Sequence, residues 1–160
     1  MSESRGGTWT EHQVNLLLAE REIRKVLLRY AAALDRKDWS LLSTCFIPEA
    51  TANYETIGLL HGYPAIESVC RTALKHMSVT QHLIGNIDIE VLGETATSTC
   101  YLHAQHVRPD TPGGSSNIIA GQYQDELDHT AEGWRIRHRT LRVLWTFGNP
   151  EIHQPGNEED

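Results

Sequence analysis

The sequence lacks the features that mark several specialised classes of protein. It contains no run of five or more lysine or arginine residues, and 21 acidic residues outnumber 14 basic ones, for a formal charge of −7. That balance argues against nucleic acid or an anionic membrane as a partner. No stretch approaches the ~18 consecutive apolar residues of a transmembrane helix. The opening residues, MSESRGGTWTEHQ, also lack the apolar core of a signal peptide.

Cysteine is scarce as well. Cys45, Cys70 and Cys100 are odd in number and share no C-x-x-C spacing. A disulfide framework uses an even number of cysteines and belongs to oxidising compartments. We therefore expect three reduced thiols in a cytoplasmic protein.

The common sequence motifs of catalysis are missing too. There is no Gly-rich phosphate loop, no G-x-S-x-G motif and no H-E-x-x-H motif. Nine histidines raise the question of a metal site, and the closest group is His103 and His106 with His82 on a neighbouring strand. Residues three apart on a strand point to opposite faces, and a metal needs several converging ligands. We therefore expect no metal ion.

The patterns that are present predict one domain over residues 1–160, with loose tails at 1–9 and 148–160. Apolar residues in steps of three and four predict a long helix over 10–37, which Thr10 and Gln13 begin as a capping box. The rest of the chain predicts a short helix at 38–46 ended by Pro48, a hairpin at 49–62, a helix at 63–77, and strands at 79–91, 96–107, 118–128 and 134–147.

This order of elements predicts an α+β fold in which helices pack on one face of a mostly antiparallel sheet. Four consecutive long strands in a meander curl strongly. A curved sheet that helices close forms a cone with an internal pocket, which is the default position for a ligand.

One histidine, His82, stands at the head of the strand-like stretch SVTQHLIGNIDIEV, residues 78–91, where apolar neighbours predict at least half burial. It is either a core histidine or a general base, and a base needs an acceptor for its Nδ1–H. Asp35 is a candidate acceptor, because it ends the apolar stripe of the first helix, where a carboxylate gains nothing from the helix dipole. Alternatively, Asp35 begins the turn DRKDW. Spacing alone does not pair the two residues.

Other polar residues also have two interpretations. Tyr30, Tyr54 and Tyr101 either donate a hydrogen bond to a substrate oxygen or are core tyrosines with their hydroxyls at the rim. Arg139 belongs to RIRHRTLRVLW, residues 135–145, and shares a face with two other arginines. Either that arginine row points outward, or Arg139 lies inside and faces an anion, because the same face turns apolar further along.

The stretches ALDRKDW, TQHLIGN and EGWRI belong to an assembly, from about Glu20 to Trp145, that resembles the SnoaL-like branch of the nuclear-transport-factor-2-like superfamily. The resemblance implies a curved antiparallel sheet wrapped by about three helices around a conical pocket. It also implies that no cofactor is needed and that the chain forms a homodimer or homotrimer.

The same resemblance implies roles for particular residues. Dehydratase and dehydrochlorinase members carry an Asp–His dyad that matches Asp35 and His82. An arginine on the last strand matches Arg139, and tyrosines match Tyr30 and Tyr54. A second polar residue falls near His103 or Gln105, and this register stays open. The expected catalytic residues are His82, Asp35, Tyr30 and Arg139, and the expected substrate-binding residues are Tyr54, Tyr101, His103 and Trp39.

Together with these residues, the resemblance implies a cofactor-independent acid–base enzyme that acts on a small, apolar, cyclic substrate. The expected reaction is β-elimination, as in a dehydratase or dehydrohalogenase, or a double-bond shift, with His82 as the base and Arg139 stabilising negative charge. Two alternatives remain: a non-catalytic binding or assembly domain, and a subunit like the β-subunit of a ring-hydroxylating dioxygenase. The fold alone does not choose among them.

Overall fold

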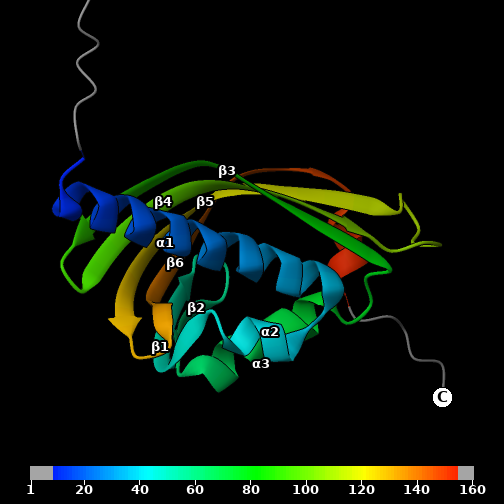
Figure 1. Cartoon of the computed structure of the whole chain (residues 1–160). Helices are drawn as coiled ribbons and strands as arrows, with labels where there is room; N and C mark the ends of the chain where they lie inside the picture. Colours follow the sequence, from blue (N-terminus) through cyan, green and yellow to red (C-terminus); the bar gives the residue numbers. More distant parts are fainter. Residues whose placement is uncertain (1–8, 155–160) are drawn as a thin grey trace, which may run out of the picture.

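The computed structural model describes residues 9–154, so the expectations for residues 1–8 and 155–160 lie outside the described part of the chain. Helices α1 (Glu11–Arg36), α2 (Trp39–Ser43) and α3 (Tyr63–Leu74) lie on one side of a curved sheet that arches over α1 (Figure 1). The predicted α+β class is confirmed. Within the described residues, no helix is both long and apolar enough to cross a membrane.

The sheet has six strands in the order β2-β1-β6-β5-β4-β3. Every neighbouring pair is antiparallel except β1 and β6, which run parallel. The strands are β1 (Phe46–Tyr54), β2 (Gly58–His61), β3 (Val79–Leu92), β4 (Thr95–Val107), β5 (Ser116–Thr130) and β6 (Gly133–Gly148). All four predicted long strands are present, with ends within two residues of the prediction. The predicted hairpin is also present, but its first strand begins three residues earlier, at Phe46.

Helix α1 begins at the capping box that the sequence predicts. The backbone N–H of Gln13 donates to Oγ1 of Thr10 at 3.2 Å, and Oε1 of Gln13 accepts from the backbone N–H of Thr10 at 2.9 Å. The helix ends at Lys37, which adopts the left-handed conformation with φ 52°. The buried stripe of α1 occupies its second half, from Ile23 to Leu34. This stripe fixes α1 against the concave face of the sheet, because burying it removes apolar surface from water.

The short second helix ends earlier than the sequence predicts. Helix α2 stops at Ser43, and Phe46 already belongs to β1, where it pairs with Ile136 of β6. Pro48 therefore lies within a strand and does not end a helix. The pairing of β1 with β6 shifts between Phe46 and Thr51, and such an irregularity tolerates a proline, which has no N–H to donate. The pairing of β1 with β6, which is distant in the sequence, makes Phe46 part of a strand and not of a helix.

The C-terminal region is more ordered than the predicted loose tail. Residues Pro150–His153 form a short 3₁₀ helix, η1, in which Ile152 is fully buried. Gly148 leads into it with φ 98°, and a Cβ at this position would lie 2.5 Å from the carbonyl oxygen of Ser116. Arg108 fastens the segment by donating to the carbonyl oxygens of Ile152 at 3.3 Å and Gln154 at 2.6 Å. A single well-buried isoleucine in a polar tail is too weak a pattern to predict this docking.

Candidate active site

A cavity of about 570 Å³ lies between the concave face of the sheet, the second half of α1, α3 and η1. Of the described residues that line it, none is Lys, Arg, Asp or Glu, so the wall carries no residue that is always charged at neutral pH. Its polar side chains are hydroxyls, one thiol and three imidazoles. The lining residues that matter for the chemistry are Tyr30, Tyr54, Cys70, His82, His106, Tyr123 and His153.

A β-bulge in β3 allows His82 to face this cavity. Gly85 pairs with Tyr101 and Asp88 pairs with Thr99, so β3 has one more residue than β4 between these two pairs. Asn86 absorbs the extra residue with φ 49°. A bulge changes which residues of a strand face inward. His82 therefore shares the concave face with residues of opposite parity beyond the bulge, Ile87, Ile89 and Val91, which pack against the core.

Asp35 contacts His82 as the dyad hypothesis requires. Oδ1 of Asp35 lies 2.7 Å from Nδ1 of His82, and the two carboxylate oxygens accept from the backbone N–H of His82 at 3.0 and 3.2 Å. The side chain of His82 is only 5% exposed and that of Asp35 is 27% exposed. Thr80 approaches the same ring nitrogen at 3.4 Å. With Nδ1 engaged by the carboxylate, Nε2 is the nitrogen left for a ligand.

Three tyrosines form the floor of the cavity. Tyr30 contacts Tyr123 edge to face, with ring centroids 5.6 Å apart. Burial raises the pKa of Tyr30, Tyr54 and Tyr123 well above the ordinary value of 10.0, so all three keep their protons at neutral pH. The buried hydroxyl of Tyr54 has no hydrogen bond of good geometry within the described residues, although it interacts weakly with the hydroxyl of Tyr30 and the thiol of Cys70. It is therefore available as a donor.

Arg139 is inside the protein, but it is already paired. Its Nε and Nη2 donate to the two carboxylate oxygens of Asp125, each at 2.7 Å, and both side chains are almost completely buried. The guanidinium lies between the rings of Tyr30 and Tyr123, at 4.0 and 4.1 Å from their centroids. Arg139 does not line the cavity itself. It lies behind the tyrosine floor, and its charge is balanced by Asp125.

The structure places three of the predicted substrate-binding residues away from this cavity. Trp39 lies under the guanidinium of Arg71, and Cζ of Arg71 is 4.7 Å from the centroid of the Trp39 ring. Tyr101 is half exposed, and the ring of His103 contacts Trp145, whose side chain is also half exposed. None of Trp39, Tyr101 and His103 lines the cavity, and neither does Gln105.

Sequence reasoning missed His106 as a site residue. Strand β4 turns Leu102, Ala104 and His106 toward the cavity, and Ala104 pairs with His82. The alternation of β4 could have predicted this orientation. From Ala96 to Ala104 every even-numbered residue is small or apolar, which marks the buried face of the strand, and His106 is the next residue on that face. His103 has the opposite parity. His153 was missed because it falls in the predicted tail.

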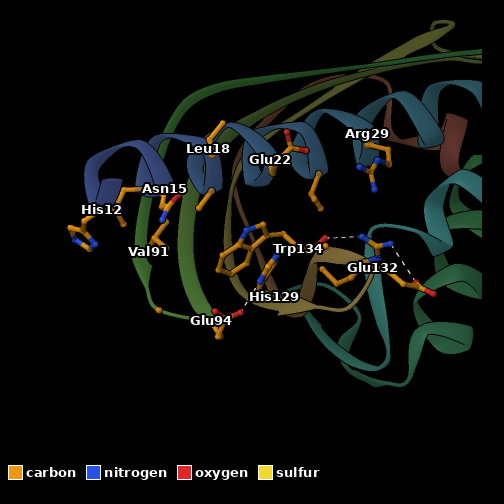
Figure 2. Close-up of a pocket in the computed structure, with 16 residues that line it drawn as sticks. His12, Asn15, Leu18, Glu22, Arg29, Val91, Glu94, His129, Glu132 and Trp134 are labelled. Carbon is orange, nitrogen blue, oxygen red and sulfur yellow. Dashed lines mark hydrogen bonds and ion pairs between the residues drawn. The ribbon is translucent and has the colours of Figure 1, made fainter. Parts of the chain in front are cut away.

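A second cavity of about 500 Å³ lies under the first half of α1, near the β3–β4 and β5–β6 turns (Figure 2). His129 and Trp134 lie side by side there, and Nδ1 of His129 is 2.7 Å from Oε2 of Glu94. Arg135 is similarly paired with Glu132 at 3.5 Å. The charged side chains here largely neutralise one another, and no predicted site residue lines this cavity. Within residues 9–154 no group of three or more candidate ligands could hold a metal ion.

Comparison with known proteins places the chain among relatives of the same fold. An uncharacterized protein of Mycobacterium tuberculosis is 31% identical over 124 residues, which are 74% of this chain and 80% of the relative. A candidate scytalone dehydratase from Novosphingobium aromaticivorans superposes with a TM-score of 0.78 at 21% identity, covering 85% of this chain and 91% of its own. Hexachlorocyclohexane dehydrochlorinase LinA-type3 from Novosphingobium barchaimii superposes with a TM-score of 0.75 at 16% identity, covering 89% and 97%.

Structural likeness at such low identity shows the fold alone. The fold neighbours also include a candidate aromatic ring hydroxylase, so the fold leaves the reaction open. The sequence family described as the SnoaL-like domain matches residues 15–140, which is most of the chain. The protein therefore belongs to the SnoaL-like domain family.

Proposed function

We propose that this protein is a cofactor-independent acid–base enzyme that catalyses β-elimination, or a related double-bond shift, on a small apolar cyclic molecule. The observation that carries the proposal is the 2.7 Å contact between Oδ1 of Asp35 and Nδ1 of His82 at the wall of the cavity. A carboxylate on one ring nitrogen fixes the tautomer and stabilises the imidazolium that forms when the other nitrogen takes a proton.

In the proposed step, Nε2 of His82 takes a proton from a ring carbon of the substrate. The electron pair of that C–H bond forms the new C=C bond, and the leaving group departs from the neighbouring carbon with its bonding pair. It leaves as chloride or, after taking the proton back from the imidazolium, as water. A positioned base of this kind contributes about 10²–10⁴-fold to the rate. The carboxylate of Asp35 holds the positive ring through Nδ1.

Tyr54 is the proposed donor to the carbonyl or leaving oxygen. Its hydroxyl is buried, makes no hydrogen bond of good geometry within the described residues, and keeps its proton. Preorganised donors of this kind stabilise the charge that develops in the transition state. We assign Arg139 a different role from the one the sequence suggests. Because Asp125 neutralises it behind Tyr30 and Tyr123, Arg139 positions the tyrosine floor and does not touch the substrate.

The names of two fold neighbours support this proposal. One fold neighbour is named a hexachlorocyclohexane dehydrochlorinase and another a candidate scytalone dehydratase. Loss of hydrogen chloride and loss of water are both β-eliminations. A cavity of about 570 Å³ falls within the ~300–1,000 Å³ of ordinary small-molecule sites and admits a ring system.

The proposal is tested with 3-chloroindan-1-one, which carries an acidic C–H between a carbonyl and a chloride-bearing carbon. We expect the protein to release chloride and indenone faster than buffer, and His82→Gln to lose about 10²-fold or more of that acceleration. His103→Gln is the matched control, because His103 lies on the neighbouring strand with its ring against Trp145, outside the cavity. Binding of the ketone with no turnover would instead identify a binding domain.

A further inference from the structure

His106 is the one buried histidine whose ring has no hydrogen-bond partner among the described residues. It is 5% exposed, lines the cavity, and leaves both Nδ1 and Nε2 unsatisfied. Buried polar groups normally have partners, and an orphan group calls for a ligand or another explanation. The proposed catalytic step does not use His106, so this ring has no assigned role.

Two other imidazoles enclose His106. The ring of His82 meets it edge to face with centroids 5.5 Å apart, and the ring of His153 does so at 5.1 Å. His82 comes from β3, His106 from β4 and His153 from η1. The three rings form one polar strip along a wall whose other cavity-lining neighbours include Leu74, Leu102 and Ala104. His106 therefore lies directly beside the proposed base.

Asn117 fixes the tautomer of His153. Nδ2 of Asn117 donates to the carbonyl oxygen of Phe147 at 3.2 Å, which leaves its Oδ1 as the acceptor for Nε2 of His153 at 3.3 Å. Nε2 of His153 is then the protonated nitrogen, and Nδ1 of the neutral ring is an acceptor. Docking of η1, through the fully buried Ile152, holds this ring against His106.

Both rings are electrically neutral near pH 7. Burial lowers the pKa of His106 from 6.5 to about 3, and burial also lowers the pKa of His153. A neutral imidazole has one donor and one acceptor nitrogen. A hydroxyl can both donate and accept, so it suits this pair of rings. A carboxylate only accepts, and it would be buried in a cavity that has no lysine or arginine in its wall.

We propose that His106 and His153 form a hydroxyl-binding subsite, which selects an uncharged cyclic substrate with a hydroxyl group near the carbon that His82 deprotonates. The hydroxyl enters between the two rings, which separate to admit it. It accepts from the protonated nitrogen of His106, donates to Nδ1 of His153, and so satisfies one of the two orphan nitrogens of His106. Because His153 belongs to η1, this short helix contributes to the selection of a substrate that carries a hydroxyl group. This inference rests on the proposed function for the position of the reacting carbon, but its binding test needs no turnover.

The test measures calorimetric affinities of three probes with one skeleton: indane, 2-indanol and indane-2-carboxylate. We expect the wild-type protein to bind indane and 2-indanol and to bind the carboxylate at least tenfold more weakly than the alcohol. His106→Phe keeps the ring shape and removes both nitrogens. It should lower the affinity for 2-indanol about fivefold or more, which corresponds to the loss of one neutral hydrogen bond, and leave the affinity for indane unchanged. His106→Gln restores a donor and an acceptor and should recover part of the loss.

Further variants separate this subsite from the proposed catalysis. His153→Phe should also lower the affinity for 2-indanol and not for indane. His103 faces outward, so His103→Gln should change the affinity for neither probe. His82→Gln should lose about 10²-fold or more of the rate acceleration for elimination and still bind 2-indanol more tightly than indane-2-carboxylate. The subsite would be overturned if His106→Phe lowered the affinities for indane and 2-indanol equally. It would also be overturned if the wild-type protein bound indane-2-carboxylate as tightly as 2-indanol. A wild-type rate of elimination in His82→Gln would overturn the proposed function and leave the subsite standing.

Discussion

Asp35 holds both the main chain and the side chain of His82. Its carboxylate accepts from the backbone N–H of His82 at 3.0 and 3.2 Å and lies 2.7 Å from Nδ1 of the same residue. The end of α1 is thus joined to the start of β3, and the ring is oriented by the group that would stabilise its protonated form. One side chain therefore links the fold to the proposed chemistry.

Replacing this carboxylate by an amide separates the two roles. Asp35→Asn keeps an oxygen that can accept from the backbone, but it removes the charge that stabilises the imidazolium. We expect kcat for 3-chloroindan-1-one elimination to fall by about 10²-fold, while the affinity for indane stays within about twofold. Asp38→Asn is the control, since Asp38 caps α2 through Leu41 and Asn caps a helix equally well. Unchanged kcat in Asp35→Asn would remove Asp35 from the mechanism.

The Arg139–Asp125 pair should behave as a buried ion pair. Both side chains are almost fully buried, so removing one partner leaves an unpaired charge in the core. We expect Asp125→Leu or Arg139→Met alone to lower the free energy of unfolding by about 3–5 kcal/mol, and the double variant to recover most of that loss. Urea unfolding of the wild type, the two single variants and the double variant gives the coupling free energy between Arg139 and Asp125. Additive losses in the double variant would show that the pairing is unimportant.

Stability should depend on the protonation of His106. Its pKa is about 3 in the folded protein and near 6.5 when unfolded, so below pH 6.5 the unfolded chain binds a proton that the folded chain does not. The free energy of unfolding therefore falls as the pH drops, by at most about 1.4 kcal/mol per pH unit, until the pH nears 3. His106→Phe should show a shallower fall between pH 6 and 4.5 in urea unfolding. Parallel curves would mean that His106 is protonated equally in both states.

Local patterns predicted the elements of this fold well, and long-range pairing supplied what they missed. The capping box of Thr10 and Gln13 and the spacing of the α1 stripe are local signals, so the helix was predictable. The parallel pairing of β1 with β6 joins segments about ninety residues apart, as in the pair Ala52 and Arg139. No local pattern contains that information, and this pairing moved Phe46 from the predicted helix into a strand.

The candidate site shows the same division. Asp35 and His82 were identified as residue types in suitable places, but their contact depends on the α1–β3 packing. The face of β3 that carries His82 depends on the bulge near Asn86, which alternation cannot locate. The partner of Arg139 was also hidden. Asp125 lies opposite it only because the β5–β6 register shifts between Glu126 and Leu127.

The most direct test of the account is whether His82 removes a proton from carbon. Deuterium incorporation at C2 of 1-indanone in D₂O, followed by mass spectrometry, reports this step without requiring the natural substrate. We predict that the wild-type protein accelerates exchange above the buffer rate, that His82→Gln loses about 10²-fold or more of this acceleration, and that His103→Gln retains it. Equal exchange rates with the wild-type protein and with His82→Gln would contradict the assignment of His82 as the base.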